Sequence, residues 1–302
     1  MKFDIYEHSD LCVASDTDSC FFQATPQLKK RLGDNFRELE QGIIINETRK
    51  IAEENAKKIN SYLNILSKEL FNVEDNQIEF KTETIIRSAY WAGKRRYAQY
   101  IVDKEGAAVS EYDMKGLDLM KSNFPPYFKD FGEQLIKDIL TGKPKQEIDK
   151  NVMDFRNSVN TVDWKMLVKP SGLKKIDEYI EAPPQSGDIF SKLKIKCPQN
   201  TRASIVTNDL LRFYKLDKQY PCFTIGDKIN TIILKNNPYK IDVIGLNGYS
   251  DAPQILKIAE EFIDKEGLFD SIIRNKLENI YADLGWSLQL NKFAKKFDVF
   301  EI

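Results

Sequence analysis

Two aspartates one residue apart are the first residues whose types and spacing could carry chemistry. Asp16 and Asp18 lie in the polar middle of residues 11–23, between two apolar arms. Apolar arms around a short polar turn predict a β-hairpin, which would hold both carboxylates close together at its tip. Neighbouring carboxylates repel one another unless a hard cation such as Mg2+ lies between them, and a pair of Mg2+ ions supports nucleotidyl transfer. Taken alone, an Asp-x-Asp pattern is more often a solvated turn.

Composition excludes several other kinds of active site. The chain has 302 residues, a single histidine, His8, and four cysteines without metal-ligand spacing. Histidine triads and histidine metal sites are therefore close to excluded, and carboxylates, Lys, Arg and Tyr must supply any chemistry. The cysteines are predicted to be reduced core residues. No apolar run is long enough to span a bilayer and no signal sequence is recognisable, so we expect a cytoplasmic protein without a membrane partner.

Positive charge is concentrated locally, although the formal net charge of the chain is −1. Between residues 165 and 218, eleven Lys and Arg stand against six Asp and Glu. A local patch of this kind, and not the total charge, governs binding to phosphate groups. A second basic group is the run Gly-Lys-Arg-Arg-Tyr at 93–97, which could contact phosphates at the end of a strand. By itself that run is more typical of a solvated basic turn.

The elements that must position these residues indicate an α+β fold. Apolar residues at alternating spacings of four and three predict a long helix with its stripe in the core: Ala52, Ala56, Ile59, Leu63, Leu66 and Leu70. Alternation from residue 77 to 86 predicts a strand, and 103–106 predicts a tight turn between two further strands. The first part of the chain is therefore predicted to be a partial antiparallel sheet with a packing helix.

Beyond residue 116 the pattern becomes mainly helical. A small β insert is predicted at 203–206 and 231–234, where apolar residues occur in runs. One helix is predicted to begin at Pro253, and another to cover 269–284 and end at Gly285. We place the domain boundary near Lys121.

The order of these features resembles the C-terminal part of a family B DNA polymerase, most like the replicative polymerases of T-even-type phages. Residues 15–19 (SDTDS) resemble the third polymerase motif, and 93–98 (GKRRYA) resemble the Lys-Lys-Arg-Tyr motif. Residues 115–122 are similar to the segment entering the thumb, 196–203 to a thumb stretch, and 296–302 to the clamp-binding tail. The resemblance covers essentially the whole chain in one order.

This resemblance implies a domain organisation and an activity. Residues 1–121 would form a partial palm, 122–290 a mainly helical thumb with a small β insert, and 291–302 a tail that binds a sliding clamp. The implied enzyme is a DNA-directed DNA polymerase, a nucleotidyltransferase of DNA replication. In its reaction the primer 3′-hydroxyl attacks the α-phosphate of a deoxynucleoside triphosphate (dNTP) and pyrophosphate leaves.

Roles are implied position by position. Asp16 and Asp18 would be the catalytic residues and the ligands of two Mg2+ ions. The residues that would hold the primer strand and its phosphates are Lys94, Arg95, Arg96 and Tyr97. Lys196 and Arg202 would grip duplex DNA from the thumb. Phe297, Phe300 and Ile302 would enter a pocket on the clamp.

Some positions depart from the family pattern. Ala14-Ser15 stands where the family has Tyr-Gly, so any contact by that tyrosine is absent. Arg95 stands where the second Lys is usual, which keeps the charge and changes its geometry. In the thumb stretch Asn200-Thr201 replaces His-Ile, which leaves only Arg202.

The chain also lacks the family's upstream Asp, its fingers helix and its exonuclease. Because it begins with Met and runs straight into a predicted strand, we expect a split polymerase. This chain would be the C-terminal subunit of an obligate heterodimer, with strands pairing across the subunit boundary. Its partners would be an N-terminal subunit with exonuclease, fingers and remaining palm, primer–template DNA, dNTP and a sliding clamp. If the protein is phage-encoded, its location would be the host cell cytoplasm.

Two alternatives remain open. The first is a non-catalytic module that binds DNA and a sliding clamp, against which the retained acidic pair and basic motif argue. The second is an unrelated Asp-x-Asp metal enzyme such as a glycosyltransferase. That class predicts parallel strands, whereas the hairpins expected here are antiparallel.

Overall fold

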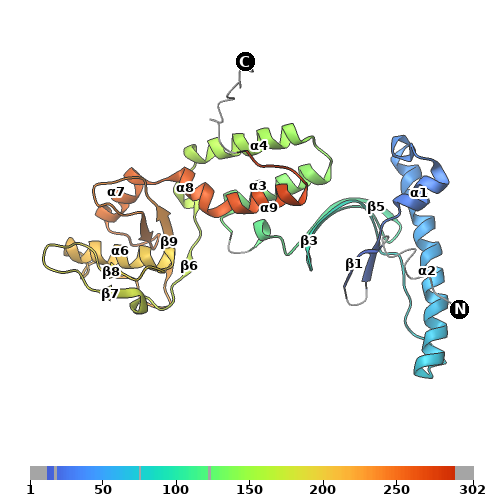
Figure 1. Cartoon of the computed structure of the whole chain (residues 1–302), viewed down its shortest axis with the longest axis horizontal. Helices are drawn as coiled ribbons and strands as arrows, with labels where there is room; N and C mark the ends of the chain where they lie inside the picture. The colour runs from blue at the N-terminus through green and yellow to red at the C-terminus, as the bar shows by residue number, and fades with distance from the viewer. Residues whose placement is uncertain (1–11, 17–18, 75, 122–123, 290–302) are drawn as a thin grey trace, which may run out of the picture. The chain divides into compact units, whose positions relative to one another are not determined.

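The computed structural model describes residues 12–16, 19–74, 76–121 and 124–289. It is 47% helical and 20% strand with small antiparallel sheets, which confirms the predicted α+β class. The chain divides into two compact units, Met1–Gly116 (unit 1) and Leu117–Ile302 (unit 2). The boundary predicted from the sequence was residue 121. Figure 1 labels most of the helices and several of the strands of the two units.

Unit 1 builds its described strands into antiparallel sheets (Figure 1). The acidic hairpin consists of β1 (Cys12–Asp16) and β2 (Ser19–Phe22), with Asp16 opposite Ser19. A three-stranded sheet follows, in the order β3 (Thr84–Gly93), β4 (Arg96–Lys104) and β5 (Ala107–Lys115). The predicted turn at 103–106 joins β4 to β5, with positive φ angles at Glu105 (51°) and Gly106 (87°).

A close approach at Gly116 holds the end of β5. Gly116 has a φ of 65°, and a Cβ added there would lie 2.3 Å from the carbonyl oxygen of Arg95. No side chain fits at this position without a shift of the backbone. The end of β5 is therefore held against the turn between β3 and β4.

The helices of unit 1 are α1 (Thr25–Leu32), the 3-10 turn η2 (Phe36–Glu38) and α2 (Gln41–Phe71). Pro26 lies in the first turn of α1 and Gly33, with a φ of 87°, ends it. A small core joins the three elements through Leu28, Phe36 and Ile51. Arg31 bridges α1 to α2 by donating to Glu47 at 2.9 Å and Glu54 at 2.6 Å.

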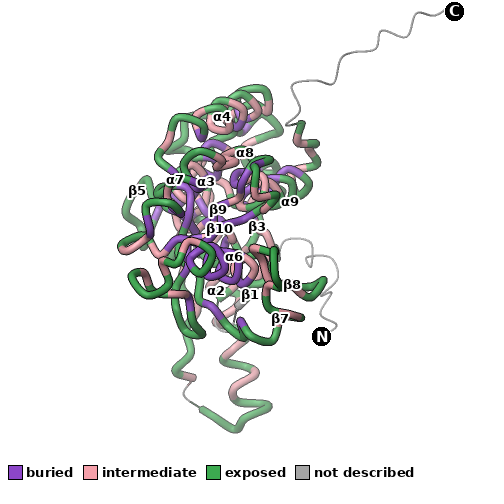
Figure 2. Tube along the Cα trace, turned by 90° about the vertical axis from the view of Figure 1, so that its left-hand side faces the viewer, coloured by how far each residue is buried: buried purple, intermediate pink, exposed green. Residues whose placement is uncertain are grey.

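The apolar stripe of α2 is not a core, contrary to the sequence prediction. Its first five members are half-buried and Leu70 is 67% exposed. Of the described residues of α2, only Ile51 is buried. The contacts of α1 and β3 fall on the N-terminal half of α2, so the C-terminal half of the stripe is left with little cover. Figure 2 shows the contrast, with α2 drawn almost entirely as half-buried or exposed.

Residues 77–83 form no strand, although their alternation predicted one. The first strand residue after α2 is Thr84. Asn60 of α2 accepts a hydrogen bond from the Phe80 backbone N–H at 2.7 Å and donates to the Phe80 carbonyl at 2.9 Å. A helix side chain thus takes the backbone groups that a neighbouring strand would otherwise pair with.

Unit 2 contains a helical region packed around aromatic side chains. Its elements are η3 (Asp118–Met120), α3 (Pro126–Leu140), α4 (Lys145–Ser158), η4 (Val159–Thr161), α5 (Trp164–Leu167), α8 (Lys265–Phe269), the π-helical η6 (Asp270–Arg274) and α9 (Asn275–Asp283). Phe128 and Phe269 are fully buried, with ring centroids 6.4 Å apart and Phe155 about equally near both. The predicted helix over 269–284 is present as η6 and α9, and Gly285 ends it with a φ of 69°.

The second region of unit 2 packs helices on small sheets. Its elements are β6 (Ser171–Gly172), η5 (Asp177–Tyr179), β7 (Ile180–Ala182), β8 (Lys192–Leu193), α6 (Gln199–Phe213), β9 (Lys228–Ile233), β10 (Val243–Leu246) and α7 (Pro253–Phe262). Pro253 opens α7, and the strand at 231–234 lies largely in β9, as predicted.

The strand predicted at 203–206 is wrong, because these residues belong to α6. Thr207 of α6 and Gly245 of β10 exchange hydrogen bonds of 3.0 and 2.8 Å, which fix the helix on the sheet. Most residues of α6 are buried. A helix buried nearly all round carries an apolar run without a helical period, so its sequence imitates a strand.

Candidate functional site

Only one of the two predicted metal ligands in the acidic hairpin lies among the residues that the structure describes. Asp16 is the last residue of β1 and pairs with Ser19, while Asp18, which precedes Ser19, lies outside the described residues. Within the described part of the chain no group of three or more His, Cys, Asp or Glu could hold a metal ion. Two carboxylates on one hairpin fit Mg2+ in donor chemistry, and a complete site needs further oxygen ligands.

An aromatic cluster joins the acidic hairpin to the basic turn. Phe21 of β2 packs edge-on against Trp91 of β3, with ring centroids 5.0 Å apart. Tyr97 of β4 completes the cluster, 5.1 Å from Trp91 and 6.4 Å from Phe21. Such contacts add stabilisation beyond the burial of their area. The hairpin that carries Asp16 and the strand that carries Tyr97 are therefore packed together within unit 1.

The basic motif forms the turn between β3 and β4. Lys94, Arg95 and Arg96 are exposed, and Arg95 has a left-handed φ of 58°. Gly93 has a φ of 146°, which a residue with a side chain rarely adopts. Arg96 folds back to donate to the Ala92 carbonyl at 3.0 Å. The three cationic side chains are therefore exposed, and the turn depends on the positive φ angles of Gly93 and Arg95.

Tyr97 is oriented by two residues that sequence reasoning did not single out for this role. Its hydroxyl lies 3.5 Å from the Asp113 carboxylate, and the Lys115 ammonium lies 5.7 Å from its ring centroid. Lys115 also forms an ion pair with Asp113 at 3.4 Å. Interaction with the Tyr97 hydroxyl, and then with Asp113, raises the pKa of Lys115 above its ordinary value. The strand register could have predicted this contact, because Lys115 lies directly opposite Tyr97 in the pairing of β4 and β5.

An ion pair to a buried carboxylate anchors α2 to the same sheet. Asp103, at the end of β4, is 2% exposed and contacts the Arg49 guanidinium of α2. Asp103 also accepts from the Gly106 backbone N–H at 3.1 Å. Burial of a carboxylate is costly unless it is paired and hydrogen-bonded, so this contact fixes the helix against the turn between β4 and β5.

The two predicted thumb residues lie near the N-terminus of α6. Lys196 lies before the helix and is exposed. Arg202, in the first turns of α6, forms a 2.6 Å ion pair with Asp242. Part of the hydrogen-bonding capacity of Arg202 is thereby used within unit 2. The predicted clamp-binding residues Phe297, Phe300 and Ile302 lie outside the described residues.

The cysteines are free, as predicted, but they are not core residues. Cys12 is exposed, and Cys20, Cys197 and Cys222 are half-buried. Burial raises the pKa of each of the latter three thiols. A raised pKa leaves a smaller fraction of each thiol as the nucleophilic thiolate at neutral pH.

Comparison with known proteins assigns the chain to no family. No protein-family model matches the chain, and no curated protein is significantly similar to it in sequence. Across the ranges that the structure describes, no helix is both long and apolar enough to cross a membrane.

Proposed function

We propose that this chain is the palm-and-thumb subunit of a split family B DNA polymerase and acts in the cytoplasm with a partner that carries the remaining catalytic residues. The packing of Phe21 against Trp91 and Tyr97 is the observation that carries the proposal. It links an acidic hairpin to a basic turn, and template-directed nucleotidyl transfer needs metal-binding carboxylates close to cations that hold the primer.

Different residues of the chain have different roles in this proposal. Asp16 and Asp18 would hold two Mg2+ ions, which when bound polarise the reacting phosphate and lower the pKa of the attacking hydroxyl. Lys94, Arg95 and Arg96 bind phosphates of the primer, and Tyr97 positions its terminal residue. Lys196 and Arg202 contact duplex DNA, and the residues Phe297, Phe300 and Ile302 bind a sliding clamp.

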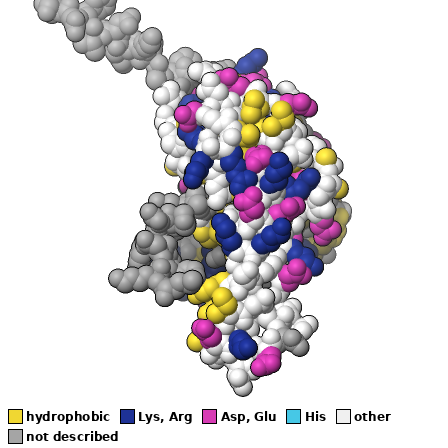
Figure 3. Space-filling view, turned by 90° about the vertical axis from the view of Figure 1, so that its right-hand side faces the viewer, with side chains coloured by type: hydrophobic (Ala, Val, Ile, Leu, Met, Phe, Trp, Pro, Cys, Tyr) yellow, Lys and Arg dark blue, Asp and Glu magenta, His cyan; other side chains and the backbone are white. Residues whose placement is uncertain are grey.

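The uncovered apolar surface of unit 1 supports a protein partner. On α2 and the loop that follows it, Ile65 is 50%, Phe71 73% and Ile78 64% exposed. Figure 3 shows charged side chains of both signs over the middle of this face, with hydrophobic side chains in one group above them and another below. Large apolar side chains left exposed on one element would be covered by a protein partner, and a two-stranded hairpin gains stability from further strands.

Primer extension with Mg2+ tests the proposal. We expect extension by the full chain together with its N-terminal partner, none by either alone, and at least a hundredfold loss in the Asp18→Ala pair. Extension that survives Asp18→Ala would contradict the catalytic role and leave a DNA- and clamp-binding subunit. The absence of extension in every combination would do the same.

Primer–template binding tests the basic turn separately. We expect Arg95→Ala to weaken binding of a primer–template duplex by about tenfold, and the loss to shrink as salt rises, because phosphate contacts release counterions. Lys104→Ala is the matched control, since Lys104 lies at the opposite end of β4 and is also exposed. Equal effects of the two substitutions would remove the turn from the DNA interface.

A further inference from the structure

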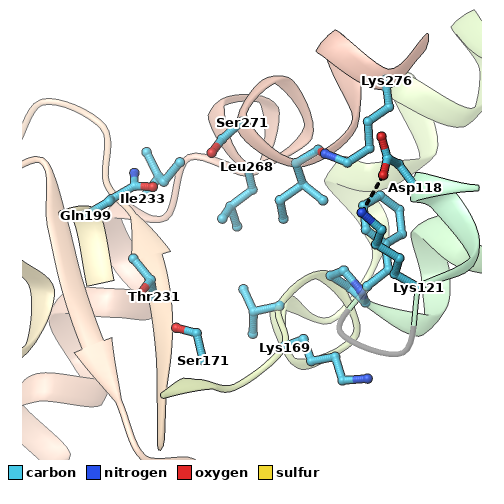
Figure 4. A pocket seen from close by; sticks show the side chains of 14 residues that line it. Asp118, Lys121, Lys169, Ser171, Gln199, Thr231, Ile233, Leu268, Ser271 and Lys276 are labelled. Carbon is cyan, nitrogen blue, oxygen red and sulfur yellow. Dashed lines mark hydrogen bonds and ion pairs between the residues drawn. The ribbon is translucent and has the colours of Figure 1, made fainter. Parts of the chain in front are cut away.

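A polar cavity within unit 2 carries an excess of positive charge. Its volume is about 370 Å3. Three lysines (Lys121, Lys169, Lys276) line it with a single carboxylate, Asp118. Figure 4 shows Asp118, Lys121 and Lys276 on the side opposite Ser171 and Thr231, which come from the strands. Asp118 and Lys121 lie in residues 115–122, the segment that resembles the entrance to the thumb, and none of the lining residues belongs to the acidic hairpin or the basic turn.

One of the three lysines is already neutralised. The Asp118 carboxylate forms a 2.6 Å ion pair with Lys121. Among the described residues neither Lys169 nor Lys276 has a carboxylate within ion-pair distance. The cavity therefore keeps two positive charges that the described part of the protein does not pair.

Lys276 is held in place and partly removed from water. Its ammonium donates to the Ile272 carbonyl at 2.5 Å and lies 5.2 Å from the ring centroid of Phe124. Burial lowers the pKa of Lys276, Asp118 opposes that effect, and the charge of Lys121 adds to it. A partly desolvated ammonium beside a second cation is stabilised by any anion that enters the cavity.

The remaining polar lining suits an anion with several acceptor oxygens. Ser171, Ser271 and Gln199 border the cavity with neutral groups that can donate hydrogen bonds. Inorganic phosphate carries about −1.5 to −2 charge at neutral pH and a backbone phosphodiester about −1, so the two unpaired lysines can neutralise either group. Lysine binds phosphate as a compact point charge and needs no planar partner.

We propose that this cavity binds a phosphate group, either as a free phosphate or as part of a nucleic-acid backbone. The proposal does not depend on the polymerase assignment, because it uses no residue of the acidic hairpin or the basic turn. Ion pairing by Lys169 and Lys276 supplies the affinity, and the hydroxyl and amide groups orient the phosphate.

Calorimetric titration of the full chain with inorganic phosphate tests the site. We expect Lys276→Met and Lys169→Met each to weaken phosphate binding about tenfold, and Lys257→Met to leave it unchanged. Lys257 is an exposed lysine on α7 that does not line the cavity. Lys169 is also exposed, so its replacement tests the site without disturbing the core.

A second titration with a blunt DNA duplex separates the two sources of phosphate. If Lys169→Met weakens duplex binding and inorganic phosphate competes with the duplex, the group bound is a backbone phosphate. If the variant loses inorganic phosphate and keeps the duplex, the ligand is a free phosphate. Phosphate binding that is absent from the unaltered chain, or equal in Lys169→Met and Lys257→Met, would overturn the proposal.

Discussion

The two units of this protein differ in how much apolar surface each buries by itself. Among the described residues, eight hydrophobic residues of unit 1 are buried and 37 of unit 2. In unit 2, Phe128 of the helical region and Leu210 and Ile229 of the second region are each fully buried. Unit 1 has a small helical core and an aromatic cluster, with large side chains exposed along α2.

This difference implies that unit 2 is stable by itself, whereas unit 1 needs a partner to cover its apolar surface. Burial of apolar surface is the main favourable term in folding. Unit 2 buries enough of its own apolar surface to be stable without a partner. Unit 1 keeps apolar surface available and carries the residues proposed for chemistry. We infer that the residues proposed for catalysis lie in the less self-sufficient unit because the partner's surface completes both its core and its site.

Removal of the fully buried aromatic ring of Phe128 in unit 2 should have the largest effect. Phe128→Ala should lower the free energy of unfolding of unit 2 by about 3–5 kcal/mol, because Phe128 is fully buried among other rings. Phe22→Ala in the acidic hairpin of unit 1 should cost less than about 1 kcal/mol, since Phe22 is 49% exposed. Denaturant unfolding of variants that keep a single tryptophan, Trp164 for unit 2 or Trp91 for unit 1, measures both by fluorescence. Equal losses would erase the contrast between the units.

Local turn chemistry explains what the sequence predicted correctly. The turn at 103–106 depends on Gly106, and the start of α7 depends on Pro253, so both follow from residues at the turn itself. The acidic hairpin and the basic turn were found in the same way. Their packing through Phe21 and Trp91 was not, because it joins residues about 70 positions apart whose contact no local pattern encodes.

Tertiary context explains what the sequence missed. The apolar run at 203–206 lies in a buried helix, where burial on all sides removes the periodic signal. The stripe of α2 has a strong period, yet periodicity shows only that a face is apolar and not which molecule covers it. The alternation at 77–83 was overridden by hydrogen bonds from Asn60.

A charge placed on the apolar face of α2 should barely change stability and should weaken association. Ile65→Glu is expected to alter the free energy of unfolding by less than about 0.5 kcal/mol, because Ile65 is already 50% exposed. Binding to the proposed N-terminal subunit should fall at least tenfold, since the carboxylate would have to be buried unpaired. Sedimentation with the partner measures the second effect, and Lys68→Glu, at another exposed position of α2, is the control. Unchanged binding by Ile65→Glu would exclude this face from the interface.

The smallest predicted effect concerns pH and belongs to unit 2. The hydroxyl groups of Tyr214 and Tyr239 lie 2.6 Å apart, and this hydrogen bond raises the pKa of Tyr214 from 10.0 to about 12. Because the folded state holds this proton more tightly than the unfolded state, the contribution is complete below pH 10 and is lost as pH rises toward 12.

Unfolding of unit 2 measured below and above pH 10 should therefore show a fall in stability that Tyr214→Phe reduces. Tyr249→Phe is the control, since Tyr249 is 87% exposed and should leave the slope unchanged. The same measurement on the Trp91 signal should lack this step, because the tyrosine pair lies wholly in unit 2. A step of equal size on both signals would mean that the two units unfold together, and the separate stability argued for unit 2 would then be wrong.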